Sequence, residues 1–230
     1  SRNTVYMALL NLTLGFIIPV ILGLLISQVR NKRTSRVVQT TTYMPYFVAP
    51  VVVCTLAKEF LKEGGAITMF LTMFGLPNQN WLAVNSPVFW FINCFLGIWQ
   101  GAGYGAIVYI AAINGIDQNL YEAACIDGAS RWQRLWNITI PSVVPLVVMM
   151  FTMQIGLVFM TGFDKVLLLY MPTTYEFSDC LSTYTYRMAF SAGNDFSLST
   201  ASGLLQSIIG TLLLIFGNKM SEKATKMSLF

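Results

Sequence analysis

The chain has 230 residues, of which 55% are apolar and only 10% are charged. Soluble domains carry about 25% charged residues, so there is too little charge here to cover a water-facing surface, and a soluble all-α protein is disfavoured. The sequence has no histidine, no CxxC pair among its four cysteines and no G-x-x-x-x-G-K-[ST] phosphate-binding loop. We therefore expect no catalytic residues, no metal site, no cofactor bound by this chain and no nucleic-acid partner.

Five stretches are apolar enough for a bilayer-spanning helix, which needs about 20 residues. They are residues 5–29, 37–57, 87–114, 138–162 and 198–218. Pro19, Pro45 and Pro50 fall inside the first two, where neighbouring helices satisfy the carbonyls that a proline frees. The pattern predicts an all-α fold, a polytopic transmembrane helical bundle that forms one domain over residues 1–230.

The charge of the connecting segments predicts the orientation. Segment 30–36 and the C-terminal tail are basic, so both are expected in the cytoplasm. Segments 58–86 and 163–197 are balanced or acidic, so both are expected outside. Cys54 and Cys94 then lie in the membrane, Cys125 inside and Cys180 outside, and we expect no intrachain disulfide.

The outer segments contain two further patterns. Residues 64–71 resemble a short amphipathic helix lying in the membrane interface. Segment 163–197 is rich in tyrosine and acidic residues, and it is interpreted either as a contact surface for an external partner or as a solvated loop. The residues concerned are Tyr170, Tyr175, Tyr184, Tyr186, Asp164 and Asp195.

The connection 116–137 is cytoplasmic by alternation, yet its net charge is negative, so it is not a basic anchor. Asp117 is a helix N-cap candidate, and Gly128 is expected to end that helix with a positive φ. Ser130 and Gln133 form a capping-box pattern that starts a second helix, and Pro141 is placed at the start of the fourth span. The signals predict two helices joined at a glycine elbow, either a docking knob or a plain helical hairpin.

The string Glu122-Ala123-Ala124, x3, Gly128, x9, Ile138-x-Ile140-Pro141 resembles the EAA loop of binding-protein-dependent ABC importer permeases, with Ile140 where leucine is usual. Neighbouring segments, namely 126–130, 138–141, Asn3-Thr4 and Ser228-Leu229-Phe230, resemble the carbohydrate-transporting branch and permeases for oligosaccharides and polysaccharide fragments in Gram-positive bacteria. Such permeases usually begin inside the cell, whereas five spans put Ser1 outside, so at least one further N-terminal helix is expected.

The resemblance implies a MetI-like fold in the cell (plasma or inner) membrane, with the C-terminus cytoplasmic. It implies a homologous second permease subunit in a heterodimer, two ABC ATPase subunits that hold ATP and Mg²⁺, and an extracellular solute-binding lipoprotein. Segment 116–137 is then the coupling loop that docks on the ATPase. The residues assigned to coupling are Glu122, Ala123, Ala124, Asp127, Gly128, Ile138 and Pro141.

Uncharged polar side chains inside the spans are candidates for the substrate pathway. They are Asn93, Gln100, Tyr104, Thr152, Thr161, Gln154, Gln206 and Ser207. An amide- and hydroxyl-rich lining suits a sugar; the alternative for each residue is interhelical hydrogen bonding. A permease for amino acids, peptides or an inorganic anion is the second hypothesis, disfavoured because no buried charge is evident. A channel or scaffold without energy coupling is the third.

Overall fold

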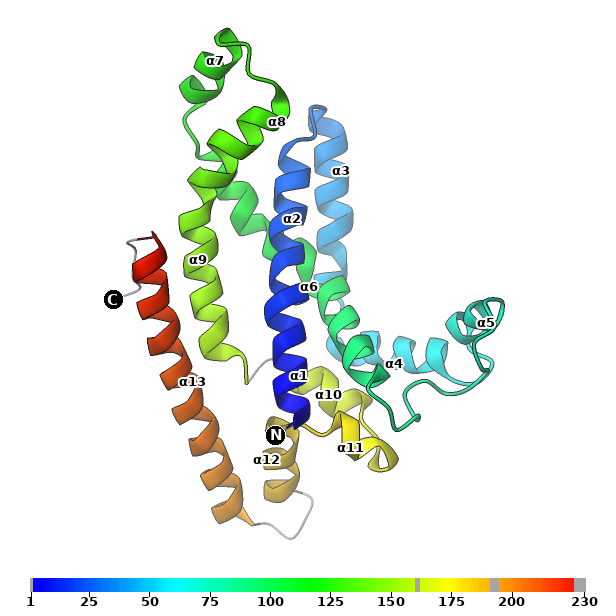
Figure 1. Ribbon diagram of the computed structural model, residues 1–230. Coiled ribbons are helices and arrows are strands. Elements are labelled where there is room, and N and C mark those ends of the chain that lie inside the picture. Colours follow the sequence, from blue (N-terminus) through cyan, green and yellow to red (C-terminus); the bar gives the residue numbers. More distant parts are fainter. Residues whose placement is uncertain (1, 160–161, 191–194, 226–230) are drawn as a thin grey trace.

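The computed structural model describes residues 2–159, 162–190 and 195–225, and all regular structure within these ranges is helical (Figure 1). Within them, four helices are long and apolar enough to cross a membrane: Arg2–Ser27, Val88–Asn114, Arg131–Leu157 and Phe196–Glu222. A bent pair, Lys32–Phe47 with Pro50–Thr72, raises the number to five when it is counted as one span. The predicted all-α membrane bundle is confirmed.

The first span is one continuous helix of α1 (Arg2–Leu10), a π-helical turn (Asn11–Gly15) and α2 (Phe16–Ser27). Pro19 has no backbone N–H, and its ring crowds the carbonyl four residues earlier, which is that of Gly15. The wider π turn ends at Gly15. The span therefore absorbs its proline by a local widening instead of a break.

The second predicted span, 37–57, is not one straight helix. α3 (Lys32–Tyr43) and a 3₁₀ turn (Met44–Phe47) are followed by α4 (Pro50–Leu61), and the chain bends by 92° between them. A residue before proline is driven into extended conformation, and Ala49 has a ψ of 137°. Pro50 therefore starts a new helix instead of kinking an existing one.

The third span, α6 (Val88–Asn114), runs through the middle of the bundle and is more enclosed than the other three unbroken spans. It packs along α2, α3 and α9. Gly103 permits the close approach of α3, because a Cβ at this position would lie 2.0 Å from the Thr42 carbonyl oxygen.

The fourth span begins earlier than position 138. α8 (Arg131–Arg134), a π-helical turn (Leu135–Thr139) and α9 (Ile140–Leu157) form one helix. The sequence predicted that the helix starts at Pro141, but the helix continues through this residue. Pro141 crowds the carbonyl of Asn137, which lies inside the π-helical turn, and the wider turn accommodates it.

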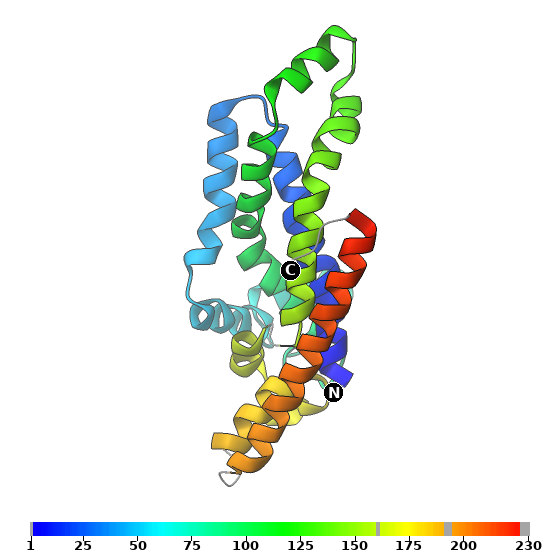
Figure 2. The same ribbon diagram turned by 90° about the vertical axis from the view of Figure 1, so that its left-hand side faces the viewer.

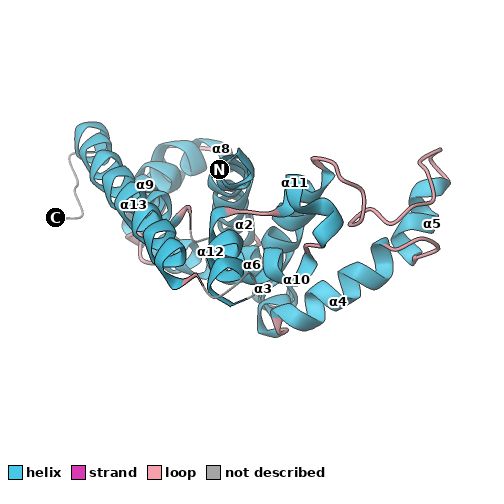
Figure 3. Ribbon diagram, turned by 90° about the horizontal axis from the view of Figure 1, so that it is seen from below, coloured by secondary structure: helices cyan, strands magenta, loops and turns pink. Residues whose placement is uncertain are grey.

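The remaining helices lie at the end of the bundle opposite α8 and along one flank (Figure 1). α5 (Ala66–Thr72) confirms the short helix expected near 64–71. Segment 163–190 folds into α10 (Phe163–Leu169), a 3₁₀ turn (Pro172–Thr174), α11 (Tyr175–Ser178) and α12 (Leu181–Phe190), so a plain solvated loop is wrong. α13 (Phe196–Thr225) packs on α9 and α12. Viewed from below, α4 and α5 extend away from the bundle on the side opposite α9 and α13 (Figure 3).

Two groups of contacts order the end of the bundle opposite α8. Asn3 donates from its amide nitrogen to the carbonyls of Glu176 and Asp179, both at 2.9 Å. Arg187 forms an ion pair with Asp179 at 2.7 Å, and its guanidinium lies 4.3 Å from the centre of the Tyr175 ring. The largest buried apolar cluster lies under these helices and includes Phe89, Trp90, Val166, Leu169 and Leu82. The helices α10 to α12 are therefore tied both to the first span and to α6.

Candidate functional site

Two regions have the geometry of a functional site, a knob at one end of the bundle and a cavity inside it. The knob is α7 (Gln118–Ile126) with α8, and it extends beyond the ends of α2 and α3 (Figures 1 and 2). Its first helix begins at Asp117, whose carboxylate accepts from the Asn119 N–H at 3.0 Å. The predicted N-cap is confirmed.

The elbow between α7 and α8 is a Schellman motif. Gly128 has a φ of 77°, a left-handed conformation that glycine adopts without steric cost. The Ala129 N–H donates to the Ala124 carbonyl at 2.8 Å and the Gly128 N–H to the Cys125 carbonyl at 3.1 Å. The backbone hydrogen bonds thus fix the angle of the elbow.

The second helix of the knob begins with the predicted capping box. The Ser130 N–H donates to the Gln133 side-chain oxygen at 2.7 Å, and the Ser130 hydroxyl accepts from the Gln133 N–H at 3.4 Å. The hydroxyls of Tyr121 and Thr139 are 2.8 Å apart, which joins α7 to the base of the fourth span. The knob is therefore connected to the start of α9 by side chains as well as by the chain.

The surface of the knob combines exposed acids with exposed apolar side chains. Glu122, Ala123 and Asp127 are exposed. Ile126, beside the elbow, is 87% exposed, and Trp132 on α8 is 70% exposed. Acidic and large apolar side chains are thus both accessible on the surface of the knob.

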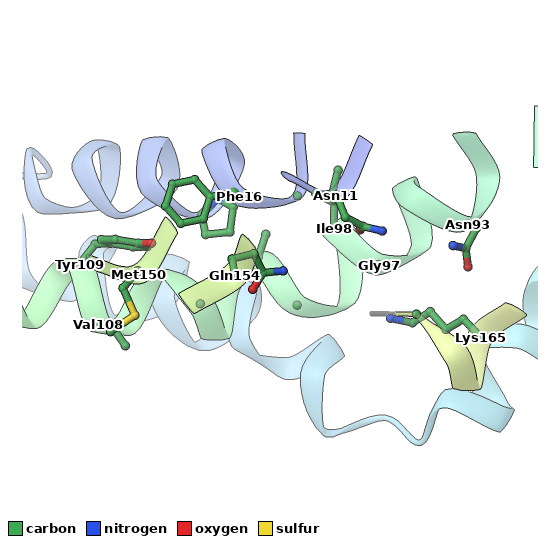
Figure 4. Close-up of a pocket in the computed structure, with 16 residues that line it drawn as sticks. Asn11, Phe16, Asn93, Gly97, Ile98, Val108, Tyr109, Met150, Gln154 and Lys165 are labelled. Carbon is green, nitrogen blue, oxygen red and sulfur yellow. The ribbon is translucent and has the colours of Figure 1, made fainter. Parts of the chain in front are cut away.

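The cavity lies among the first span, α6, α9 and α10, and its volume is about 370 Å³ (Figure 4). Asn93, Gly97, Gly101 and Gly105 occur at every fourth position of α6, so they share one helix face, and all four line the cavity. Phe16, Tyr109, Val108 and Met150 line its apolar part, and Asn11, Asn93, Gln154 and Lys165 supply its polar groups. This mixture is typical of small-molecule sites.

The sequence candidates for the pathway fall into two groups. Asn93 and Gln154 line the cavity. Gln100 is buried and donates to the Val48 carbonyl at 2.7 Å, and Tyr104 stacks on Tyr46 at a ring distance of 3.9 Å. Both of these residues therefore hold the broken second span against α6. This is an interhelical packing role and not a position on the cavity wall.

Three further candidates make local or interhelical contacts. The Thr152 hydroxyl donates to the Val148 carbonyl four residues earlier at 2.8 Å, and the Ser207 hydroxyl does the same with Gly203 at 3.1 Å. The Gln206 amide donates to the Ser182 hydroxyl at 3.4 Å and joins α13 to α12. Thr161 lies outside the described residues, as does the 228–230 string.

Sequence reasoning missed Lys165, which it counted among the charges of the outer segment. α10 instead directs the Lys165 side chain into the cavity, at the end where Asn93 lies, with Asn11 next along the cavity and Gln154 nearer to Phe16 (Figure 4). Burial is the main cause that lowers the pKa of Lys165. The expectation that the interior of the bundle lacks charge is therefore wrong at Lys165, which lines the cavity. The sequence signal that could have located it is its position, because Lys165 follows the predicted end of the fourth span at residue 162 by only three positions.

A family model described as the binding-protein-dependent transport system inner membrane component matches residues 15–226. The chain belongs to this family. It is a multi-pass inner-membrane permease of an ABC importer, and as such it is the non-catalytic component of a transport complex that works with a binding protein.

Relatives of the permease include two proteins of Bacillus subtilis (strain 168). The polygalacturonan/rhamnogalacturonan transport system permease protein YteP is 35% identical over 223 residues, which are 96% of this chain and 69% of YteP. Protein LplB is 33% identical over 231 residues, which are 100% of this chain and 72% of LplB. The similarity extends through both the knob and the helices that line the cavity.

Among solved structures, the permease resembles a chain of a bacterial alginate ABC transporter in complex with alginate pentasaccharide-bound periplasmic protein. The TM-score is 0.92 with 36% sequence identity, and the match covers 99% of this chain and 79% of that chain. A second structure, of an ABC transporter that imports the acidic polysaccharide alginate, gives a TM-score of 0.91 with 37% identity. The fold described above is thus that of an importer permease.

Proposed function

We propose that this permease forms half of the translocation pathway for an oligosaccharide that an extracellular solute-binding protein delivers. The relatives named for polygalacturonan and for alginate support a carbohydrate substrate. The cavity chemistry supports it as well, because amide groups that hydrogen-bond hydroxyls lie beside aromatic and apolar walls on which a sugar ring can pack.

The knob formed by α7 and α8 is the proposed ATPase-coupling element, and its geometry is the observation that carries the function. In this proposal Glu122 pairs with a polar or basic group of the ATPase, while Ala123 and Ala124 permit close seating. Gly128 sets the elbow, and Asp127 with the exposed Ile126 lies at its tip. Ile138 and Pro141 belong to the helix that continues from the knob into the fourth span.

The proposed assembly contains a second, homologous permease subunit in a heterodimer, two ABC ATPase subunits and a solute-binding lipoprotein. ATP and Mg²⁺ bind to the ATPase subunits. The basic segment 30–36, the knob and the C-terminus face the cytoplasm, and α10 to α12 face outward. Asn93 and Gln154 are the proposed pathway residues; Gln100, Tyr104, Thr152 and Gln206 support the helices around it.

The coupling role is tested by Gly128→Asp in the complete importer in proteoliposomes. An aspartate at a φ of 77° strains the elbow and adds a charge to the docking tip. We expect ATP-driven uptake and the stimulation of ATPase activity by the loaded binding protein to be lost together. Co-purification of the ATPase with the permease measures assembly, and a chain that retains no ATPase even in its native form would point to a scaffold.

Gly75→Asp is the matched control. Gly75 also has a positive φ, 83°, and open space around it, but it lies at the outer end beyond α5. The same kind of strain away from the knob is expected to leave coupling intact. Undiminished uptake and undiminished ATPase stimulation in Gly128→Asp would overturn the assignment of the knob.

A further inference from the structure

The polar end of the cavity contains a cation, Lys165, that forms no ion pair with any residue that the structure describes. Lys165 extends into it from α10, and a Cβ built on Gly97 of α6 would lie 3.9 Å from the Lys165 Nζ. The two ion pairs found among the described residues join Lys62 to Glu59 and Arg187 to Asp179, and neither involves Lys165. An ammonium that is partly withdrawn from water, with the Asp164 carboxylate nearby but not ion-paired to it, favours an anionic occupant.

The same end contains an unsatisfied acceptor. Asn93 is 4% exposed, and its Oδ1 has no hydrogen-bond partner among the described residues. Its amide nitrogen reaches only the Met7 sulfur, at 3.7 Å, a weak acceptor. A buried amide in this state costs free energy, so it is suited to a ligand hydroxyl. Asn93 and Lys165 come from different helices and face the same end of the cavity (Figure 4).

The α6 face leaves room for an occupant at this end. Gly97 and Gly101 are one turn apart, and a Cβ on Gly101 would meet nothing within 4 Å. The cavity volume of about 370 Å³ falls in the range of ligand sites. The polar end thus supplies space, a positive charge and a hydrogen-bond acceptor, whereas the apolar end supplies Phe16 and Tyr109.

We infer that Lys165 and Asn93 form a subsite that recognises the carboxylate and a hydroxyl of an acidic, uronate-type sugar during translocation. The ammonium pairs with the carboxylate, and the Asn93 Oδ1 accepts from a neighbouring hydroxyl. This inference rests on the proposed function and deepens it, because it gives this permease its own selection for acidic oligosaccharides in addition to that of the binding protein.

The test measures uptake by the complete importer in proteoliposomes with two substrates of equal length, an oligogalacturonate and its full methyl ester. Each is supplied at saturating loaded binding protein, so the preference of the binding protein does not enter the ratio of variant to wild type. Lys165→Gln is expected to lower uptake of the acid by about ten-fold or more, the value of a hydrogen bond to a charged group. Uptake of the ester is expected to stay unchanged.

Two variants serve as controls. Lys165→Arg keeps the charge and is expected to retain uptake of the acid. Lys62→Gln removes a charge from the same side of the membrane outside the cavity, and both substrates are expected to move as in wild type. If Lys165→Gln does not assemble, Asn93→Asp tests the subsite in its place. An aspartate has the shape of asparagine, and its carboxylate would neutralise the charge of Lys165. We therefore expect it to lower uptake of the acid and to leave uptake of the ester unchanged.

The outcomes separate the two proposals. If wild-type importer moves neither oligosaccharide with ATP, the proposed carbohydrate function fails. If wild type moves them and Lys165→Gln treats acid and ester alike, whether by equal retention or by equal loss, the subsite is refuted. A loss confined to the acid supports it.

Discussion

The knob and the cavity differ in how the sequence encodes them. The caps and the elbow that shape the knob all lie within residues 117–133, from the Asp117 cap through Gly128 to the Ser130 capping box. The polar end of the cavity requires Asn11, Asn93, Gln154 and Lys165, which come from four helices. Local hydrogen bonds therefore build the knob, which is the proposed docking element, while long-range packing builds the cavity, which is the proposed substrate site.

This contrast predicts that packing changes near α6 affect the whole bundle, whereas changes at the knob stay local. Gly103→Leu is expected to have the largest effect. Its Cβ would lie 2.0 Å from the Thr42 carbonyl oxygen, so α3 and α6 must separate, at a cost of about 3 kcal/mol or more. Thermal unfolding in detergent, followed by size-exclusion chromatography, measures the loss.

Gly203→Ala is the control for that variant. Gly203 lies in α13, and a Cβ there would meet nothing within 4 Å. Alanine in a helix is better than glycine by roughly 0.5–1 kcal/mol, so no loss of stability is expected. A Gly103→Leu chain as stable as Gly203→Ala would show that α3 is not held closely by α6.

Gln100→Leu is expected to have an intermediate effect. It leaves the Val48 carbonyl at the bend without its donor, which costs about 1–3 kcal/mol. The unfolding temperature should fall, while the apparent KM for the oligosaccharide should stay constant, because Gln100 supports the bend and does not line the cavity. A raised KM at an unchanged unfolding temperature would instead show that Gln100 contributes to the substrate pathway.

Ser130→Ala is expected to have the smallest effect on stability. It removes one side of the capping box, at a cost of about 1 kcal/mol confined to α8. Hydrogen exchange should therefore speed up in residues 130–134 and remain unchanged in α6. Faster exchange in α6 as well would mean that the stability of the bundle depends on the knob, and the expectation that changes at the knob stay local would fail.

The sequence was sufficient for the spans, the N-cap, the elbow and the capping box because each depends on periodicity or on neighbours along the chain. It was insufficient at Pro50, where a proline inside an apolar run was expected to leave one span; the extended Ala49 instead starts a new helix after a bend of 92°. It also did not locate Lys165, since charge counting assigns a loop to one side of the membrane but not a side chain to a cavity. The roles of the coupling and pathway residues stay predictions.

The fourth span connects the knob to the cavity as one continuous helix. Its 27 residues run from the knob at Arg131 to Leu157, just beyond Gln154 at the cavity. At 1.5 Å per residue the arm from Arg131 to Gln154 is about 35 Å long, so a tilt of about 5° about its knob end sweeps Gln154 through about 3 Å. That displacement is comparable to the length of a hydrogen bond, so a small rotation of the fourth span about its knob end is enough to make or break a hydrogen bond of Gln154.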